Sequence, residues 1–312
     1  MSFVRAYAPA TIANLGVGFD ILGMAIRGAG DVVDVALRPD PGVNLLSVSG
    51  DDGRLPRETE RNTATVAAAA VLRLAGADMG LDVHLLKGLP LNSGLGSSAA
   101  SAVAAAIATN ACLGEPLQRE ELLPACLEAE AIVSGWHADN IAPSLLGGIR
   151  LIAGTEADQI HELPAPDQLH LALVTPEVDV PTRLAREVLP THVTLAQMVA
   201  QTSAAARLVA ALYTGDLTTL AQAMEADGVV EPARSSLMPK LPEARLAARG
   251  AGGLGLFISG AGPTLCAVCE SEALARDVEA ALGAVYQEAG IPCQARATQV
   301  DPAGARLLQA TL

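Results

Sequence analysis

The sequence predicts an α+β fold divided into two domains, and three observations carry this prediction. The chain has 312 residues, which exceeds the usual size of a single domain. Segments with the patterns of strands and of helices are mixed along it without the strict alternation of a doubly wound sheet. The segment 153–168 contains Pro164, Pro166 and many polar residues. We therefore expect a boundary there, between an N-terminal domain of residues 1–160 and a C-terminal domain of residues 161–312.

The N-terminal domain is expected to combine short strands with three longer helices. Asn62 or Thr63 is a suitable N-cap for the first helix, and Gly76 is a suitable stop. Pro124 should delay or kink the start of the third helix. The predicted strands are 4–7, 31–37, 43–48, 81–86 and 149–153, and the predicted helices are 62–77, 98–113 and 119–133.

The C-terminal domain shows a similar mixture, and no internal repeat is visible. Apolar runs and helical periodicity predict the strands 169–174, 254–259 and 264–269 and the helices 183–188, 195–214, 217–226 and 273–288. Cys266 and Cys269 fall in the last of these strands, where residues three apart face opposite sides of a sheet. We therefore expect both thiols to be core residues and not metal ligands.

Charge and composition exclude several classes of function. The net charge is −14 and the chain has three Phe, three Tyr and one Trp, which argues against a nucleic-acid surface built from a basic stripe or a stacking platform. The only lysines are Lys87 and Lys240. Neither stands in the Gly-Lys-Ser/Thr sequence of a Walker phosphate loop, so that type of nucleotide site is excluded.

No sorting signal is apparent in the sequence. The N-terminus lacks a charged segment followed by an apolar one, so no signal peptide is predicted. The alanine-rich stretches 64–77 and 99–113 are interrupted by polar residues before they reach ~18 apolar residues, so no membrane span is expected. Five cysteines without paired spacing are typical of a reducing compartment. A cytoplasmic location is therefore expected.

Glycine-rich turns occur at 14–18, 94–98, 250–255 and 259–264. The second follows a predicted strand and opens a long helix, so its backbone N–H groups and the positive helix end would converge on one anion. Ser97 and Ser98 add hydroxyls where a nucleotide-bound Mg²⁺ would lie. Taken alone, this loop is equally consistent with a tight turn. A dinucleotide fingerprint is disfavoured, because Glu115 is followed by Pro116 and a helical run. The third turn precedes a strand and is interpreted as structural.

Together these turns resemble the three motifs of the GHMP kinases, a family that includes galactokinases, mevalonate kinases and homoserine kinases. The motifs are matched by residues 8–20, 90–101 and 258–264. Similarity to the homoserine kinases in particular is carried by residues 13–23, 135–143, 147–148, 182–190 and 231–234. The matching motifs are spread over essentially the whole chain and follow one another in the same order as in the family.

The resemblance also implies a fold and a reaction. The family fold joins an N-terminal ATP-binding domain like ribosomal protein S5 to a ferredoxin-like C-terminal domain. Homoserine kinases transfer the γ-phosphate of ATP to the hydroxyl of L-homoserine, with Mg²⁺, to give O-phospho-L-homoserine in threonine biosynthesis. The resemblance implies a cytoplasmic enzyme, often a homodimer, with no nucleic-acid or membrane partner. Ile12, Val17 and Asn92 depart from the family pattern, although Asn92 tolerates a left-handed backbone.

For the nucleotide, the resemblance implies Ser98 and Glu130 as Mg²⁺ ligands. Glu128 lies two residues before Glu130 on a predicted helix, so only one of the two can face the ion, and the family match selects Glu130. The implied nucleotide-binding residues, of which Asn62 and Lys87 would contact adenine or ribose, are Asn62, Lys87, Leu91, Asn92, Ser93, Gly94, Leu95, Gly96, Ser97, Ser98, Ala99, Ala100 and Ser101.

For the amino acid, the implied binding residues are Asn14, Asp20, Asn140, Thr182, Arg186 and Arg234. The two arginines suit a planar, bidentate grip on a carboxylate. Asp20, Asp139 and Glu130 are the implied catalytic residues. Asp20 and Asp139 are candidates for a general base, and His137 is a third that fits a structural role as well. Transfer of the hydroxyl proton to the phosphate itself is the alternative.

Other functions remain open at this point. The first is another kinase of the same family, acting on mevalonate or a sugar. The second is a non-catalytic nucleotide-binding relative, which would be expected to have lost a metal ligand or a substrate arginine, whereas Ser98, Glu130, Arg186 and Arg234 are all present. The third is a nicotinamide-binding dehydrogenase.

Overall fold

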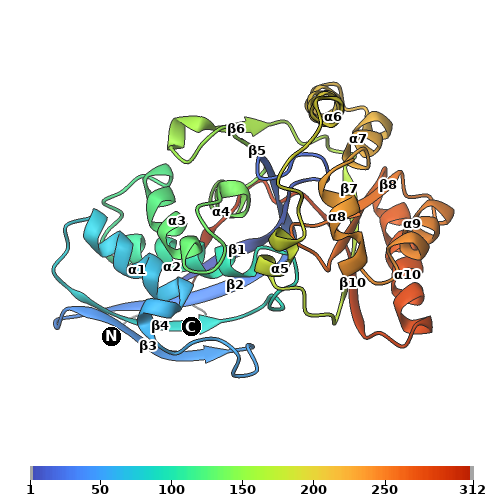
Figure 1. Ribbon diagram of the computed structural model, residues 1–312. Helices are drawn as coiled ribbons and strands as arrows, with labels where there is room; N and C mark the ends of the chain where they lie inside the picture. The colour runs from blue at the N-terminus through green and yellow to red at the C-terminus, as the bar shows by residue number, and fades with distance from the viewer. Residues whose placement is uncertain (1–2, 310–312) are drawn as a thin grey trace.

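The computed structural model describes residues 3–309, which form two sheets with helices packed on each (Figure 1). The first sheet has seven strands: β1 (Val4–Ala13), β2 (Leu22–Arg38), β3 (Gly42–Ser49), β4 (Gly80–Leu86), β5 (Ile149–Ile152), β6 (Ile160–Leu163) and β11 (Arg306–Leu308). Its order is β11-β1-β2-β4-β3, with β5 pairing β2 and β6 pairing β5. Only β3 and β4 pair in parallel. The expected α+β class is confirmed.

Four helices belong to the first half: α1 (Thr63–Leu74), α2 (Ser97–Cys112) and α4 (Ala138–Leu146) pack on the sheet, and α3 (Leu123–Ala131) packs against these helices (Figure 1). The Asn62 side chain caps α1 by accepting a hydrogen bond from Ala64 N (3.1 Å), as the sequence predicts. Every alanine of α2 from Ala99 to Ala108 is completely buried. Because alanine is short, α2 can lie close to the sheet and to α1, and it forms the centre of this half.

The second sheet is antiparallel, in the order β10-β7-β9-β8, and carries two helices. Its elements are β7 (His170–Pro176), β8 (Gly255–Ile258), β9 (Leu265–Cys269), β10 (Cys293–Gln299), α9 (Leu241–Gly250) and α10 (Glu272–Glu288). Tyr286 of α10 is completely buried, and its hydroxyl donates to the Pro239 carbonyl (2.9 Å). Cys266 and Cys269 are fully buried free thiols in β9, as expected.

Four helices lie between β7 and β8 along the chain: α5 (Thr182–Glu187), α6 (Leu195–Thr214), α7 (Leu217–Met224) and α8 (Val230–Arg234). Figure 1 shows α5 and α8 between the two sheets. Short 3₁₀ helices are η1 (Thr59–Arg61), η2 (Glu120–Leu122), η3 (Ala157–Gln159) and η4 (Ser235–Leu237). The η2 turn precedes α3, whose first turn contains Pro124, so the delayed start expected from this proline is confirmed.

The structure differs from the predicted elements in several places. β1 continues to Ala13 and β2 begins at Leu22, whereas 4–7 and 31–37 are the predicted limits. The elements α4, α8, α9, β6, β10 and β11 were not predicted. Pro143 lies inside α4, and β10 and β11 have no fully buried residue. β10 and β11 therefore lack the buried face from which a strand is predicted, and a proline inside a short segment argues against a helix.

Two strands that lie wholly or mostly on the C-terminal side of the expected boundary belong to the first sheet. β6 begins at Ile160 and pairs with β5, and β11 at residues 306–308 pairs with β1. Strands on both sides of residue 160 thus hydrogen-bond within the first sheet. The division into 1–160 and 161–312 stays a prediction.

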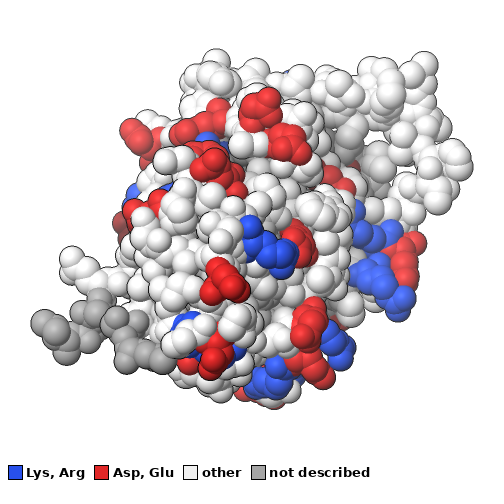
Figure 2. All heavy atoms as spheres, turned by 90° about the vertical axis from the view of Figure 1, so that its left-hand side faces the viewer, with Lys and Arg blue, Asp and Glu red and all other residues white. Residues whose placement is uncertain are grey.

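The surface carries both signs of charge. On the face in Figure 2, acidic and basic side chains are interspersed, with no continuous basic stripe on that face. Among residues 3–309, no helix is long and apolar enough to span a membrane.

Candidate active site

The second and fourth glycine-rich turns, at 94–98 and 259–264, are in direct contact. Ser259 Oγ donates a hydrogen bond to the Gly94 carbonyl (2.6 Å), and Thr264 Oγ1 donates to the Ser93 carbonyl (2.6 Å). Gly94 has a φ of 75°, and a Cβ at this position would collide with the Ser259 carbonyl oxygen. Only glycine fits there without a shift of the backbone. The loop before α2 is thereby fixed against the turn that joins β8 to β9.

This loop brings the N-terminus of α2 to a cavity. Gly96 is the N-cap in a left-handed conformation (φ 64°), and a Cβ there would collide with Thr11 Oγ1 of β1. Thr11 N also donates to the Leu95 carbonyl (3.1 Å). The first N–H groups of an α-helix lack partners within the helix and carry the positive end of its dipole. Because Gly96, Ser97 and Ser98 line the cavity, this edge of it suits an anion.

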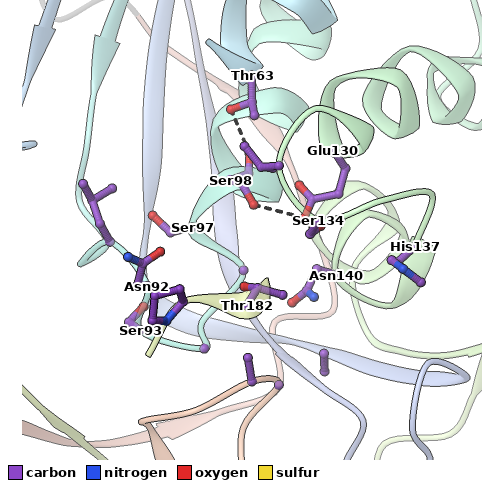
Figure 3. A pocket seen from close by; sticks show the side chains of 18 of the residues that line it. Thr63, Asn92, Ser93, Ser97, Ser98, Glu130, Ser134, His137, Asn140 and Thr182 are labelled. Atoms are coloured by element: carbon purple, nitrogen blue, oxygen red, sulfur yellow. Dashed lines mark hydrogen bonds between the residues drawn. The ribbon is translucent and has the colours of Figure 1, made fainter. Parts of the chain in front are cut away.

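The cavity has a volume of about 440 Å³ and is lined by residues from both halves of the molecule. It brings together all but three of the predicted site residues, namely Asn14, Asp20, Asn62, Lys87, Leu91, Asn92, Ser93, Gly94, Gly96, Ser97, Ser98, Ser101, Glu130, Asp139, Asn140, Thr182, Arg186 and Arg234. Figure 3 shows Ser98, Glu130 and Asn140 among the residues around it. Leu95, Ala99 and Ala100 do not line it, because their side chains are buried in the hydrophobic core. These three have only backbone groups to offer a ligand.

Glu130 and Ser98 lie side by side at the cavity wall (Figure 3). Ser98 Oγ donates to Glu130 Oε1 (3.1 Å), and the Ser134 hydroxyl donates to the same oxygen. Glu130 is 4% exposed, its burial raises the pKa of the carboxyl, and Oε2 has no hydrogen-bond partner among the described residues. A buried carboxylate oxygen left unpaired beside a hydroxyl fits Mg²⁺, which takes few protein ligands and completes its shell with water and phosphate.

Two arginines line the same cavity. Arg186 of α5 donates to both carboxylate oxygens of Asp20 (2.9 and 3.1 Å). Arg234 of α8 donates to the carbonyls of Ala185 (2.9 Å) and Gly260 (2.8 Å). Arg234 is 3% exposed, and its burial, followed by the charge of Arg186, lowers its pKa to about 10. Two guanidinium groups that lie near one carboxylate suit a further carboxylate from a ligand.

Phe19 lies beside both of these arginines. The Cζ atoms of Arg186 and Arg234 are 5.4 and 5.3 Å from the centre of its ring. The negative face of an aromatic ring attracts a cation within ~6 Å. Phe19 therefore offsets part of the repulsion between the two arginines and helps to hold them at the cavity.

The predicted amide residues fix the turn between β1 and β2. Asn14 Nδ2 donates to the Gly260 carbonyl (3.1 Å), and Asn14 Oδ1 accepts from Asp20 N (3.1 Å). Asn140 Oδ1 accepts from Thr11 Oγ1 (2.7 Å), so its amide NH₂ is the group left for a ligand. Thr182 begins α5 and is half-buried at the cavity.

The candidate bases differ in their surroundings. Asp139, at the start of α4, is 5% exposed, and burial followed by the negative charges of Asp20 and Glu130 raises its pKa to about 7. His137 Nδ1 is 3.7 Å from Asp20 Oδ2, and partial burial lowers the pKa of this imidazole. Asp20 itself is engaged by Arg186 through both oxygens. All three candidates line the cavity.

Replacing Asp139 with Asn should stabilise the unliganded protein more as the pH rises. Between pH ~4 and ~7 the Asp139 carboxyl is ionised in the unfolded wild type but still protonated in the folded protein. The free energy of unfolding of the wild type therefore falls as the pH rises through this window, by up to about 4 kcal/mol, whereas asparagine does not titrate. We expect the Tm gain of Asp139→Asn over the wild type to be smaller at pH 5 than at pH 8. The exposed Asp167→Asn should show no such trend. A pH-independent gain would contradict a raised pKa.

Asn62 and Lys87 use their side chains within the protein. Asn62 accepts from Ala64 N and donates to the Pro56 carbonyl (3.2 Å). The Lys87 ammonium donates all three of its hydrogen bonds to protein oxygens. The Lys87 ammonium was expected to contact adenine or ribose, but in the structure it has no donor left for such a contact.

Three further residues that the sequence did not single out line the cavity. Ser134 follows Glu130 by four residues, which is the spacing that places a serine hydroxyl next to a helical carboxylate. Thr63 Oγ1 donates to the Ser98 carbonyl (3.3 Å) and joins α1 to α2. Phe19 stands next to Asp20, and its place in the first motif, residues 8–20, was its only signal.

Comparison with known proteins agrees with this geometry. Models of the GHMP kinases match the chain twice, the N terminal domain at residues 62–148 and the C terminal domain at residues 208–288. The homoserine kinase of Arabidopsis thaliana is 42% identical over 98% of this chain and 84% of its own length. The homoserine kinase of Xylella fastidiosa (strain 9a5c) is 39% identical over 97% of this chain and 94% of its own.

A solved structure extends the similarity to three dimensions. The crystal structure of homoserine kinase from Cytophaga hutchinsonii superposes on this chain with a TM-score of 0.94 at 38% identity, covering 99% of this chain and 98% of that one. The two-domain GHMP kinase fold expected from the sequence is therefore confirmed. Identity of this degree over nearly the whole length shows that the chain belongs to the homoserine kinases of the GHMP kinase family.

Proposed function

We propose that this chain transfers the γ-phosphoryl group of ATP to the side-chain hydroxyl of L-homoserine, giving O-phospho-L-homoserine for threonine biosynthesis. The observation that carries the proposal is that one cavity combines an anion-binding helix end with a buried carboxylate and a pair of arginines. The first two features suit a nucleotide with its metal, and the third suits the carboxylate of an amino acid.

For the nucleotide, the backbone N–H groups of residues 93–98 hold the triphosphate at the N-terminus of α2. Ser98 and Glu130 hold Mg²⁺, which neutralises charge on the phosphate oxygens when bound. Phosphoryl transfer depends on positioning and on charge stabilisation more than on covalent help from the protein. The described residues contain no group of three or more His, Cys, Asp or Glu able to hold a metal. One carboxylate with a hydroxyl is the donor set expected where phosphates supply other ligands.

For the amino acid, Arg186 and Arg234 grip the α-carboxylate. Arg186 pairs with Asp20, and we propose that the substrate carboxylate takes over part of this interaction and frees Asp20 for the ammonium or the hydroxyl. The free amide NH₂ of Asn140 is a donor for the reacting end, with Asn14 and Thr182 beside it.

The proton of the hydroxyl goes to Asp20, Asp139, His137 or the phosphate itself. A base with a pKa near the working pH is the most effective, which favours Asp139 among the side chains. The dependence of kcat on pH for Asp20→Asn and Asp139→Asn, measured separately, distinguishes these routes. Loss of the rising limb in one variant identifies the base, and near-wild-type rates in both exclude both carboxylates.

Phe19→Leu should weaken homoserine binding and leave ATP binding unchanged. Leucine keeps the apolar bulk but removes the ring face that both arginines share, so we expect the KM for homoserine to rise on the order of tenfold. Steady-state kinetics with each substrate varied in turn measure the effect. Phe3→Leu, at an exposed position just before β1, is the matched control. An equal rise in both KM values would show a general disturbance of the cavity instead.

An ADP-release assay with homoserine, mevalonate and galactose tests the proposed function. We expect release with homoserine alone, because mevalonate lacks an ammonium group and galactose lacks both the ammonium and the carboxylate. Turnover of mevalonate or galactose would favour another kinase of the family, and nucleotide binding without turnover of any would favour a non-catalytic relative. A cytoplasmic location and a homodimer stay predictions from the family resemblance.

A further inference from the structure

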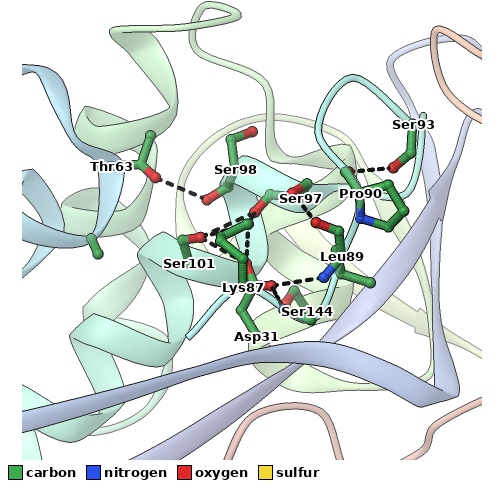
Figure 4. Close-up of polar contacts among 12 residues, drawn as sticks. Asp31, Thr63, Lys87, Leu89, Pro90, Ser93, Ser97, Ser98, Ser101 and Ser144 are labelled. Carbon is green, nitrogen blue, oxygen red and sulfur yellow. Dashed lines mark hydrogen bonds and ion pairs between the residues drawn. The ribbon is translucent and has the colours of Figure 1, made fainter. Parts of the chain in front are cut away.

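A buried ion pair lies beneath the phosphate loop and is not used by the proposed reaction. Asp31 of β2 and Lys87, just after β4, have side chains that are 0% and 1% exposed. The two strands pair in antiparallel register through Val32 and Leu86, so the next residue on each strand lies opposite the other. Figure 4 shows the pair together with the start of α2. No water-exposed surface is available to either charge.

The aspartate holds the beginning of the loop. Asp31 Oδ1 accepts hydrogen bonds from the N–H groups of Gly88 (2.9 Å) and Leu89 (3.2 Å), which are the first residues after the lysine. Its other oxygen accepts from Lys87 and from Ser101 Oγ (2.7 Å). One carboxylate thus fixes the backbone where the chain leaves the sheet.

The lysine holds the end of the loop. Lys87 Nζ donates to the Ser97 carbonyl (2.8 Å) in the first turn of α2 and to Ser101 Oγ (2.9 Å) one turn later. With the bond to Asp31, this uses all three donors of the ammonium. The segment between the two anchored ends, residues 90–96, contributes Leu91, Asn92, Ser93, Gly94 and Gly96 to the lining of the cavity, next to the α2 terminus.

Stability alone is a weak reason for such a pair. A buried ion pair loses the hydration of both charges, and apolar residues of similar size often stabilise a fold as well or better. Apolar residues could not hydrogen-bond to four separate groups of the loop and of α2, as this pair does. Both oxygens of Asp31 and two of the three donors of Lys87 are used for these contacts. This pattern of hydrogen bonds indicates that the pair serves to fix the position of the loop before α2.

We propose that Asp31 and Lys87 are positioning residues that anchor both ends of the phosphate loop, so that its backbone N–H groups are already in place when the nucleotide arrives. The inference rests on the proposed function, in which this loop takes the triphosphate of ATP. It differs from the role of a Walker lysine, because the charge of Lys87 is neutralised by Asp31 and its donors all face the protein. The pair affects ATP binding only indirectly, by fixing the loop whose backbone N–H groups contact the phosphates.

Three variants separate position from charge. Lys87→Met removes the anchor at Ser97 and leaves Asp31 without a counter-ion. The double variant Asp31→Asn/Lys87→Met removes both charges, while the amide oxygen of the introduced asparagine can still accept from Gly88 and Leu89. Ser101→Ala removes one hydroxyl at the centre of the network and changes no charge. Lys240→Met is the matched control, since the only other lysine of the chain pairs with Glu243 at the surface.

The readouts are the KM for ATP, the KM for homoserine and the rise in Tm caused by MgADP. For Lys87→Met we expect the KM for ATP to increase on the order of tenfold or more, with the KM for homoserine nearly unchanged and the rise in Tm reduced. The double variant lacks the anchor at Ser97 as well, so it should keep most of the loss of ATP affinity although no charge is left unpaired. Ser101→Ala should show a smaller loss of the same kind. A merely structural role would lower Tm in all three variants without separating the two KM values.

Each outcome decides something different. A wild type that releases no ADP with homoserine would defeat the proposed function, whatever the variants do. If the wild type is active and folded Lys87→Met keeps its KM for ATP, the positioning role is wrong. If the double variant regains the wild-type KM for ATP, the loss in Lys87→Met comes from the unpaired charge of Asp31 and not from the missing anchor, and the proposal also fails. Should Lys87→Met not fold, Ser101→Ala and the double variant give the same decision.

Discussion

Glu130→Gln should lower kcat on the order of 1000-fold, with the hydroxyl contacts around it preserved. Glutamine has nearly the same shape and can still accept from Ser98 and Ser134, so the change removes chiefly the negative charge. The oxygen left without a partner, Oε2, becomes an amide nitrogen that cannot bind a cation. Single-turnover rates at saturating ATP, homoserine and Mg²⁺ measure the effect.

Glu128→Gln is the control for this variant. Glu128 lies two residues earlier on α3, where its exposed carboxylate pairs with Arg73 (2.6 Å). The same change of charge on the same helix should leave kcat unaltered, because that face points away from the cavity. A Glu130→Gln enzyme within tenfold of the wild type would remove Glu130 from the proposed metal site.

Arg234→Ala should raise the KM for homoserine on the order of 100-fold, while the KM for ATP changes little. Arg234 is buried at the cavity, and its loss would leave the substrate carboxylate with one guanidinium instead of two. Initial rates with homoserine varied at saturating ATP, and then the reverse, separate the two constants. Arg207→Ala, on the exposed face of α6, should match the wild type.

A second variant distinguishes substrate binding from support of α5. Arg234 also donates to the carbonyls of Ala185 and Gly260, so its removal could displace the helix that carries Arg186. Arg186→Ala leaves those two carbonyls with their partner and should still raise the KM for homoserine. If only Arg234→Ala has an effect, its role is to hold α5, and the proposed grip on the carboxylate by both arginines is wrong.

The parts of the fold that the sequence predicts well are those with local causes. Asn62 caps α1 and Pro124 delays α3, and both effects act within one helical turn. β11 could not be predicted, because three exposed residues become a strand only through pairing with β1 about 300 positions earlier. α4 was missed because Pro143 and its short length hide its helical pattern.

In the candidate site, too, features with local causes could be predicted from the sequence, whereas those that depend on distant residues could not. The phosphate loop is visible in the sequence because positive φ values at Gly94 and Gly96 require glycine locally. Lys87 was assigned to the nucleotide, since nothing local reveals that Asp31, 56 residues away, takes up its charge. The pairing of Glu130 with Ser98 likewise depends on how α2 and α3 pack, and only the family resemblance pointed to it.

The return of β11 to the first sheet sets an order for biosynthesis. β1 is synthesised about 300 residues before β11, so residues 5–7 gain their second neighbour only when residues 306–308 arrive. Until synthesis has passed Leu308, one edge of the nucleotide-binding half is an open strand that can pair with another nascent chain. Fragments that stop short of this point should therefore aggregate, and a nascent chain should acquire its full resistance to proteolysis late.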